Sequence, residues 1–450
     1  MPRRMLRAAA VLLVASLALS LKRRLGRPAS GSREIRFRYP METGSLAGAG
    51  DAAFFHLIGR TVQRRVRERF FEGWGQAVAY QEPHVRLPFT PLLCCEPGYS
   101  VLMDRFDWQV VPETAYKNAT HVGGCRPIDG QPWRSDTVQK ADPWTVWVAP
   151  HGLPRLLQLA EARLDGRRRD RVVVFSGTEV PLSQAFGASP AERGATIARL
   201  RRYFGRIVYQ IKDIELEHVS AAPMGFGWGY ALKYLGLLCK GAYPATRNRI
   251  AHAFLELEDL FTVANASAKT RAVLATGGVT ATWLEDPALP ALVRRFRRQG
   301  VGFPPSNSSL EVVSDSFKSR RQMRAWARSS AARAAGVEFR IVPSTEWWQE
   351  LSTYRFLLSP IGSAIQTAKT VEALLVLTVP IIQRMGYALH DELIDMGFPI
   401  VLVEEWPEVT SAAVEGWWRA TSPRLESFRR NCLTVDSYWR MFVGELRRCT

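Results

Sequence analysis

The chain has 450 residues, of which 47% are hydrophobic, and its 60 Lys and Arg against 42 Asp and Glu leave a net charge of +18. This length corresponds to two or three domains of about 150 residues, and this hydrophobic fraction excludes an intrinsically disordered protein. A single apolar run of near-spanning length excludes a polytopic membrane protein, and six cysteines in so long a chain exclude a small disulfide-stapled scaffold.

The first predicted element is the hydrophobic run Ala8–Leu21, which has basic residues at both ends. As a helix its 14 residues would span about 21 Å, against a hydrocarbon core of roughly 30 Å. We expect residues 1–24 to form a signal-anchor helix whose flanking Arg and Lys side chains snorkel, followed by a flexible stem over 25–50. A cleaved signal peptide, cut at Ala18-Leu19-Ser20, and a buried amphipathic helix are the alternatives. The anchor predicts membrane contact through residues 8–21 and a body in the lumen of the Golgi or ER.

Two further features agree with a lumenal body. Asn-x-Ser/Thr sequons begin at Asn118, Asn265 and Asn307. The cysteines lack the C-x-x-C spacing of a zinc ribbon, so disulfides are possible, and we favour Cys432–Cys449 and a bond from Cys125 to Cys94 or Cys95. Six ordinary buried thiols are the alternative.

Three basic stretches carry much of the excess charge: Arg163–Arg171, Arg294–Arg298, and a predicted helix with Lys318, Arg320, Arg321, Arg324 and Arg328. No zinc-finger, RNP or helix-turn-helix pattern accompanies them, so we expect no nucleic-acid partner. Solvated helix faces explain most such runs. The functional alternative is an electropositive cleft for polyanions, such as nucleotide diphosphates or acidic glycans.

Strand and helix patterns alternate in two blocks. The first, within 51–240, has a helical segment at 51–80, then loops with short strands at 81–145, and then predicted strands Thr145–Ala149, Arg171–Phe175 and Arg206–Gln210 with helices Pro154–Leu164 and Pro190–Tyr203. The second, within 268–410, has strands Ala272–Ala275, Glu338–Val342, Arg355–Leu358, Pro380–Gln383 and Ile400–Val403 with helices Lys318–Ala335, Glu346–Tyr354, Thr367–Thr378 and Tyr387–Met396. For helix Lys318–Ala335 we expect Ser316 as the N-cap and Gly336 just past the end.

Short apolar runs that are each followed by a helix indicate parallel sheets buried on both faces. We therefore predict an α/β fold of two tandem Rossmann-like lobes, joined near 240–268 and followed by helices over 411–450. Ligands of such folds bind at the carboxyl ends of the strands.

The segment over 355–375 carries the candidate chemistry. A strand ends in the loop Ser359-Pro360-Ile361-Gly362, and a helix begins near Thr367 with its positive end toward that loop, which makes an anion site. Lys369 adds a point charge, and Glu372 shares its helix face and could accept hydrogen bonds from ribose hydroxyls. This combination suits a nucleoside diphosphate, while an ordinary surface pair of Lys369 and Glu372 is the alternative.

The same segment resembles a known family. Five stretches are similar to the C-terminal signature of exostosin-type glycosyltransferases, including the ribitol xylosyltransferase-like branch. They are Phe356–Gly362, Lys369–Leu375, Val379–Ile382, Phe398–Val401 and Glu404–Thr410. Weaker landmarks are Ser319-Arg320-Arg321 and the stretch Ala222–Gly225 after Glu217-His218. The resemblance implies a GT-B fold with an acceptor-side lobe over 51–240 and a nucleotide-sugar-binding lobe over 268–410. It also implies a type II Golgi membrane protein that glycosylates a glycan or glycoprotein from a nucleotide sugar, which we expect to be UDP-linked.

Residue roles carried over by position form a donor site. The resemblance assigns the donor phosphates to Lys369, the ribose to Glu372, the loop around the donor to Ser359, Pro360 and Gly362, and the leaving diphosphate to Arg320 or Arg321. It implies inverting transfer without a metal or other cofactor, because cationic side chains stabilise the leaving group. The chain departs from the family at Ala364 and at Leu377, where glycines are common. These departures motivate the rival hypothesis of a catalytically inactive glycan-binding or scaffolding relative.

The catalytic base should come from a strand end of the first lobe. Glu179 follows the strand that ends at Phe175, and His151 follows the strand over 145–149, so both are candidates, and either could be an ordinary loop residue. Thr276-Gly277-Gly278 is a possible second diphosphate contact. We expect Trp347-Trp348 and Trp417-Trp418 to pack between lobes or in a core, with acceptor stacking as the alternative.

Overall fold

The computed structural model describes residues 102, 105–110, 138–148, 152–177, 180–225, 261, 264–276, 307–343, 346–362 and 364–450. All of them belong to one compact unit, His56–Thr450. The predicted anchor and stem, the helix over 51–80 and both candidate bases, Glu179 and His151, lie outside the described residues. Within the described part, no helix is both long and apolar enough to cross a bilayer.

The first sheet is parallel and its five strands follow one another in chain order. They are β1 (Trp108–Val110), β2 (Thr145–Val148), β3 (Val172–Phe175), β4 (Arg206–Tyr209) and β5 (Val219–Ala221). Every residue of β2 and β3 is buried, as expected for a strand covered on both faces. The predictions for β2, β3 and β4 are confirmed to within one residue at each end, whereas β5 was not predicted.

Among the described residues, three helices accompany the first sheet: α4 (Leu153–Arg163), α5 (Leu182–Ala185) and α6 (Pro190–Leu200). A capping box starts α6, because the Ser189 hydroxyl accepts from the Glu192 amide at 3.2 Å and the Glu192 carboxylate accepts from the Ser189 amide at 3.1 Å. Apolar residues of α4 and α6 pack with one face of the sheet in a single core cluster.

The second sheet is also parallel, with the order β7-β6-β8-β9-β10. Its strands are β6 (Arg271–Ala275), β7 (Val337–Phe339), β8 (Tyr354–Leu358), β9 (Val379–Gln383) and β10 (Val401–Val403). The chain first moves outward from β6 to β7 and then returns past β6 to β8, so the strand order reverses between β6 and β8. This is the order of a doubly wound α/β sheet. Two five-stranded parallel sheets confirm the predicted α/β class, while the predicted domain boundaries stay predictions.

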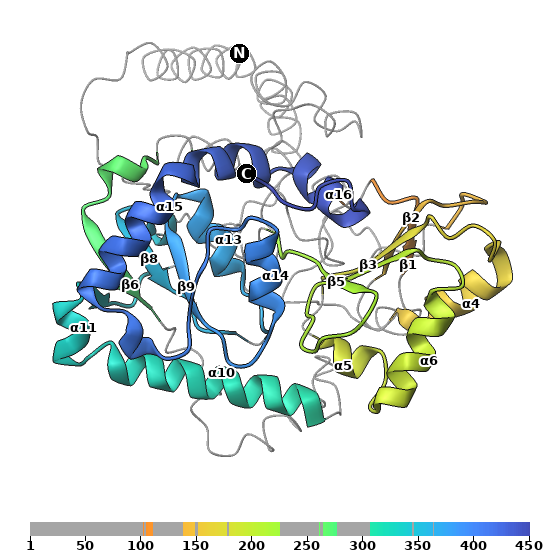
Figure 1. Ribbon diagram of the computed structural model, residues 1–450, viewed down its shortest axis with the longest axis horizontal. Helices are drawn as coiled ribbons and strands as arrows, with labels where there is room; N and C mark the ends of the chain where they lie inside the picture. The colour runs from red at the N-terminus through yellow and green to blue at the C-terminus, as the bar shows by residue number, and fades with distance from the viewer. Residues whose placement is uncertain are drawn as a thin grey trace, which may run out of the picture. The chain divides into compact units, whose positions relative to one another are not determined.

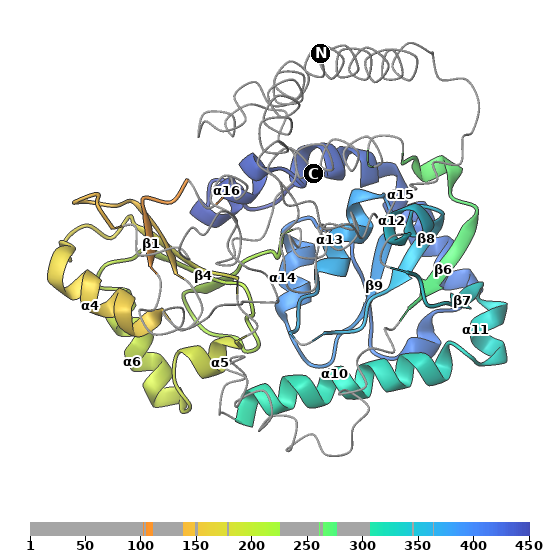
Figure 2. The same ribbon diagram turned by 180° about the vertical axis from the view of Figure 1, so that it is seen from behind.

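Helices of the second half are α10 (Asn307–Trp326), α11 (Ser330–Ala334), α12 (Trp347–Leu351), α13 (Ala368–Leu375) and α14 (Leu389–Asp395), with short 3-10 helices η4 (Ala266–Ala268) and η6 (Trp406–Glu408). Helix α10 contacts η6 and also α5 of the first half, and Figure 2 shows it as one long helix between α11 and α5.

The prediction of one helix over Lys318–Ala335 with Ser316 as its N-cap is wrong. Ser316 lies inside α10, which begins at Asn307. Its hydroxyl donates to the carbonyl of Ile361 at 3.0 Å and does not cap a helix. The helix breaks where Ser329 caps α11 by accepting from the Ala332 amide at 3.1 Å. Gly336 follows the end of α11 at φ +75°, as predicted.

The chain ends in α15 (Ser411–Cys432) and α16 (Val435–Val443), within the predicted C-terminal helical segment. Trp417 and Trp418 of α15 pack edge-on against Phe356 of the second sheet, so this pair packs in a core. Helix α16 returns to the first sheet, where Arg206 donates to the Phe442 carbonyl at 2.8 Å (Figure 1).

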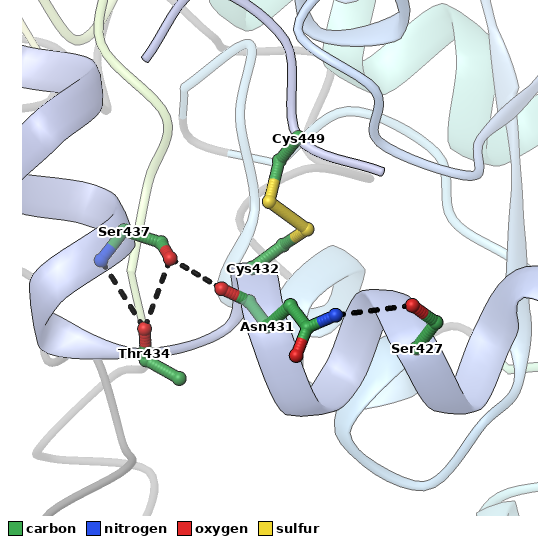
Figure 3. Close-up of a disulfide and its surroundings, with 6 residues drawn as sticks. All are labelled: Ser427, Asn431, Cys432, Thr434, Ser437 and Cys449. Atoms are coloured by element: carbon green, nitrogen blue, oxygen red, sulfur yellow. Dashed lines mark hydrogen bonds between the residues drawn. A yellow bond between two sulfur atoms is a disulfide. The ribbon is translucent and has the colours of Figure 1, made fainter. Parts of the chain in front are cut away.

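A disulfide joins Cys432 to Cys449, which confirms one predicted pairing (Figure 3). The other four cysteines lie outside the described residues. The Cys449 amide also donates to the Met396 carbonyl at 2.8 Å. Gly397 is at φ +100°, and a Cβ there would lie 1.9 Å from the Cys449 carbonyl oxygen, so only glycine fits beside this tail.

Candidate functional site

The loop Ser359–Gly362 occupies the position at which doubly wound sheets bind ligands. It follows the carboxyl end of β8, and the strand order reverses between β8 and β6. Ligands of open α/β sheets bind outside the carboxyl ends of the strands at this reversal. After β6, Thr276 is buried, while Gly277 and Gly278 lie outside the described residues. The predicted binding loop therefore lies at the reversal point of the second sheet.

Close packing fixes the conformation of this loop. Ser359 and Pro360 are buried, and the Ser359 hydroxyl lies 3.2 Å from the hydroxyl of Thr367. A Cβ added at Gly362 would lie 3.0 Å from the Thr367 methyl group and 3.5 Å from the Arg320 guanidinium. A side chain at position 362 would therefore crowd Thr367, the N-cap of α13.

Helix α13 begins without a side-chain cap. Its N-cap Thr367 has the extended backbone typical of a cap, yet its side chain accepts no amide hydrogen bond and pairs with Ser359. By contrast, Thr410 and Thr434 cap α15 and α16 through their hydroxyl groups. The first-turn amides of α13 and the positive end of its dipole are therefore not occupied by the cap, as an anion-binding helix end requires.

Lys369 and Glu372 of α13 meet around Trp347, the first residue of α12. The Lys369 ammonium lies 5.3 Å from the centre of the Trp347 ring. The Trp347 indole donates to one carboxylate oxygen of Glu372, Oε2, at 2.7 Å. The Glu372 side chain is only 2% exposed, and its other oxygen, Oε1, has no hydrogen-bond partner among the described residues. A buried carboxylate oxygen without a donor indicates a place for a ligand hydroxyl.

Burial perturbs both titratable groups of this pair. It lowers the pKa of Lys369 to about 8, with the Arg320 charge adding to the effect and Glu372 opposing it. Burial raises the pKa of Glu372 to about 7, against the hydrogen bond from Trp347 and the charge of Lys369. Both charged forms are disfavoured without a ligand. A phosphate beside Lys369 and a hydroxyl donor at Glu372 would each offset the free-energy cost of burying the charged group.

Only one of the two candidate arginines reaches the loop. The Arg320 Nε donates to the carbonyl of Ile361 at 3.0 Å, beside the bond from Ser316 to the same oxygen. Arg321, the next residue of α10, is exposed. The structure brings Arg320, Gly362 and Lys369 together and does not bring Arg321 to them.

Gln366, which precedes the N-cap of α13, ties the loop to the first sheet. Its amide nitrogen donates to the carbonyl of Gln210, just after β4, and to that of Ala222, just after β5, at 2.8 Å for the second bond. Its oxygen accepts from the Met224 amide at 2.7 Å. Because Gln210 and Ala222 end their strands, the loop before α13 lies between the carboxyl edges of the two sheets.

The candidate bases cannot be placed against this loop, because Glu179 and His151 lie outside the described residues. The last described residue before Glu179 is Gly177, whose amide donates to the side-chain oxygen of Gln210 at 2.7 Å. The β3 loop therefore leaves the sheet beside the residue that also holds Gln366.

A small cavity lies on the other face of α13, lined by Gln366, Thr367, Thr370 and His390 among others. Its volume of about 10 Å³ has room for one water molecule and not for a nucleotide. Burial lowers the pKa of His390 to about 4, so this imidazole is neutral near pH 7. We therefore assign no ligand to this cavity.

The two departures from the exostosin pattern are accommodated in the cores. Leu377 takes φ +59°, a conformation that favours glycine, and its side chain is fully buried against the second sheet. Leucine pays about 1–2 kcal/mol there, which the burial of its side chain offsets. Ala364 is buried in the cluster beside the first sheet. Neither side chain gives a reason to expect a blocked loop.

Two residues of this site were not predicted from the sequence. Trp347 was expected to pack between lobes or in a core, with acceptor stacking as the alternative, and Gln366 was not singled out. Both lie within residues 346–410, the stretch that resembles the exostosin signature, but neither is one of the residues that carry the resemblance, and no local periodicity marks them. The one feature of the sequence that could have pointed to Gln366 is its place as a polar residue just before the N-cap of α13.

Comparisons with known proteins add little to this geometry. No family model matches the chain, and no curated protein does. Among solved structures, the chain is similar to an alpha,alpha-trehalose 6-phosphate synthase from Burkholderia multivorans, at 14% identity and a TM-score of 0.30, over 69% of this chain and 72% of that one. Similarity at this level carries no argument about family or activity, so the proposals below rest on the site itself.

Proposed function

We propose that this protein is a glycosyltransferase of the exostosin type, with a GT-B arrangement of its two sheets. It transfers a sugar from a UDP-linked donor to a glycan or glycoprotein acceptor. The observation that carries the proposal is the buried Oε1 of Glu372, which has no hydrogen-bond partner among the described residues and lies near Lys369 at the uncapped start of α13. An oxygen that needs a donor and a cation that needs an anion, held side by side, suit the ribose and diphosphate of one nucleotide.

Each contact of the donor follows from this chemistry. The diphosphate lies over the first turn of α13, where backbone amides and the Lys369 ammonium donate to its oxygens. Glu372 Oε1 accepts from a ribose hydroxyl. The Arg320 guanidinium, close to Gly362, adds positive charge on the far side of the loop.

Transfer proceeds with inversion at the anomeric carbon. A base removes the proton of the acceptor hydroxyl, whose oxygen forms a bond to that carbon as the bond to the diphosphate breaks. The nucleoside diphosphate leaves with the electron pair, and Lys369, Arg320 and the α13 dipole stabilise its charge. We propose Glu179 or His151 as the base, since both follow strands whose carboxyl ends lie on the edge that Gln366 contacts.

The disulfide supports a proposal about the compartment. A disulfide between Cys432 and Cys449 forms and persists in oxidising compartments. We propose that residues 8–21 anchor the protein in a Golgi or ER membrane with its body in the lumen.

Turnover of a nucleotide-sugar panel tests the proposal. The purified protein should hydrolyse one UDP-sugar slowly in the absence of acceptor. Glu372→Gln should raise the KM for that donor at least tenfold, because an amide is a weaker acceptor for a ribose hydroxyl than a carboxylate. Glu426→Gln, at a half-exposed carboxylate of α15, is the matched control and should behave as wild type. If no member of the panel is turned over and neither UDP nor GDP binds, the proposed function is wrong.

A further inference from the structure

Trp347 contacts both donor-binding residues through different parts of its side chain. The indole N–H donates to Glu372 Oε2 at 2.7 Å, and the ring faces the Lys369 ammonium at 5.3 Å. Its neighbour Trp348 is fully buried and packs edge-on against Phe261, with 5.7 Å between ring centres. Because Trp348 anchors α12 in the core, the direction in which Trp347 projects is fixed.

The indole N–H decides how Glu372 presents its carboxylate. By occupying Oε2, it prevents rotation of the carboxylate and leaves Oε1 as the oxygen without a partner among the described residues. It also favours the ionised form, since it donates to a carboxylate that burial would otherwise keep protonated. Glu372 therefore keeps one free, oriented acceptor.

The ring acts on Lys369 in a different way. A cation over an aromatic face is attracted without being neutralised, whereas a carboxylate in that place would cancel the charge. Among the described residues no acidic side chain forms an ion pair with Lys369, and the charge of Glu372 acts on it from a greater distance. The ammonium is thus held in place with its positive charge still available to an anion.

We propose that Trp347 is a positioning residue of the donor site, whose N–H orients Glu372 toward the ribose while its ring holds Lys369 for the diphosphate. This inference rests on the proposed function and assigns the two halves of one ligand to two parts of one side chain. Trp347 itself need not touch the reacting atoms.

Two variants separate the two actions. Trp347→Phe keeps an aromatic face and removes the N–H, while Trp347→Leu removes both. Titration calorimetry with inorganic pyrophosphate reports the Lys369 half, and titration with UDP reports both halves. Trp347→Phe should bind pyrophosphate like wild type and UDP about tenfold more weakly. Trp347→Leu should weaken both ligands. Trp418→Phe, at a partly buried tryptophan of α15, is the control for the loss of an indole.

Dependence on pH and on a second variant excludes a merely structural role. The charged group that acts on Glu372 is Lys369 on its own helix, and the charge of Arg320 on α10 acts in turn on Lys369. In wild type, UDP affinity should rise as Glu372 ionises near pH 7, and in Trp347→Phe this midpoint should move to higher pH. The double variant Trp347→Phe/Glu372→Gln should bind UDP no more weakly than Glu372→Gln alone.

Different results would contradict the proposed function and the role of Trp347. If wild type binds neither pyrophosphate nor UDP, the proposed function fails. If wild type binds UDP and Trp347→Phe binds it with unchanged affinity and pH dependence, only the role of Trp347 is wrong. Equal weakening of both ligands by Trp347→Phe, or additive losses in the double variant, would also overturn it. Should Trp347→Phe fail to fold, Trp347→His, which keeps an aromatic ring and an N–H, should bind both pyrophosphate and UDP more tightly than Trp347→Leu. Equal binding by these two variants would overturn the role of Trp347.

Discussion

Replacing Lys369 with Met should stabilise the ligand-free protein and weaken its binding of nucleotides. Lowering the pKa of an ammonium from 10.5 to about 8 means that the empty site disfavours its charged form by about 3 kcal/mol. At pH 7 the ammonium is nevertheless charged, so the folded protein carries this cost. Because Lys369 is partly exposed, we expect Met to recover about 1–3 kcal/mol. For a folding unit as long as His56–Thr450, that is an increase in Tm of roughly 1–4 °C.

The stabilisation by Lys369→Met should depend on pH. Lys369 has a pKa near 10.5 when unfolded and about 8 when folded, so between these values the unfolded state binds more protons. Its contribution to the free energy of unfolding therefore rises with pH from 8 to 10.5. The stabilisation by Lys369→Met should be largest at pH 7 and should shrink toward pH 10. Scanning calorimetry at both pH values measures it.

Although Lys369→Met should stabilise the protein, it should weaken the binding of UDP. Loss of one charge-assisted contact to a diphosphate costs about 1.5–3 kcal/mol, or roughly 10- to 150-fold in the Kd for UDP. Wild-type affinity should also fall as pH rises above 8, and Lys369→Met should lack this decline. Arg333→Met, at an exposed position of α11, removes the same charge and should change neither quantity. A Lys369→Met protein that is less stable than wild type at pH 7, yet binds UDP equally well, would refute the reasoning.

Three further predictions concern the loop, the disulfide and the sequon. Gly362→Ala places a Cβ 3.0 Å from the Thr367 methyl group and should weaken UDP binding roughly 10- to 100-fold by calorimetry, whereas Gly416→Ala, with nothing within 4 Å, should bind normally. Cys449→Ser opens a bridge across a sequence separation of 17 residues and should cost about 3 kcal/mol, seen as a lower Tm; an unchanged Tm would contradict a structural role. Asn265 is exposed and begins an Asn-x-Ser sequon, so mass spectrometry of the protein expressed in cultured cells should find a glycan there that Asn265→Gln removes; a bare Asn265 would count against the lumenal body.

Much of the fold could be predicted because buried parallel strands are continuous apolar runs. The Val-rich β3 shows this, since neither face meets water and its limits follow directly from the sequence. The strand β5 escaped prediction because it has three residues with a serine at its centre, and only pairing with β4 makes it a strand. The start of α10 was misplaced for a related reason. The Ser316 hydroxyl bonds to Ile361 across the fold, which no local capping rule reveals.

The candidate site divides in the same way. The loop, Lys369 and Glu372 lie close together along the chain. A strand, a glycine turn and a helix start therefore identify them together from the sequence. Trp347 and Gln366 act through contacts to residues on other elements, so their roles appear only once the chain is folded. The choice of Arg320 over Arg321 likewise depended on which face of α10 meets the loop.

The most direct measurement is a crystal structure of the protein with UDP bound. The account predicts phosphate oxygens within hydrogen-bond distance of the first-turn amides of α13 and of the Lys369 ammonium, and a ribose hydroxyl at Glu372 Oε1. Nucleotide bound elsewhere in the molecule, with Glu372 Oε1 still lacking a donor, would contradict it.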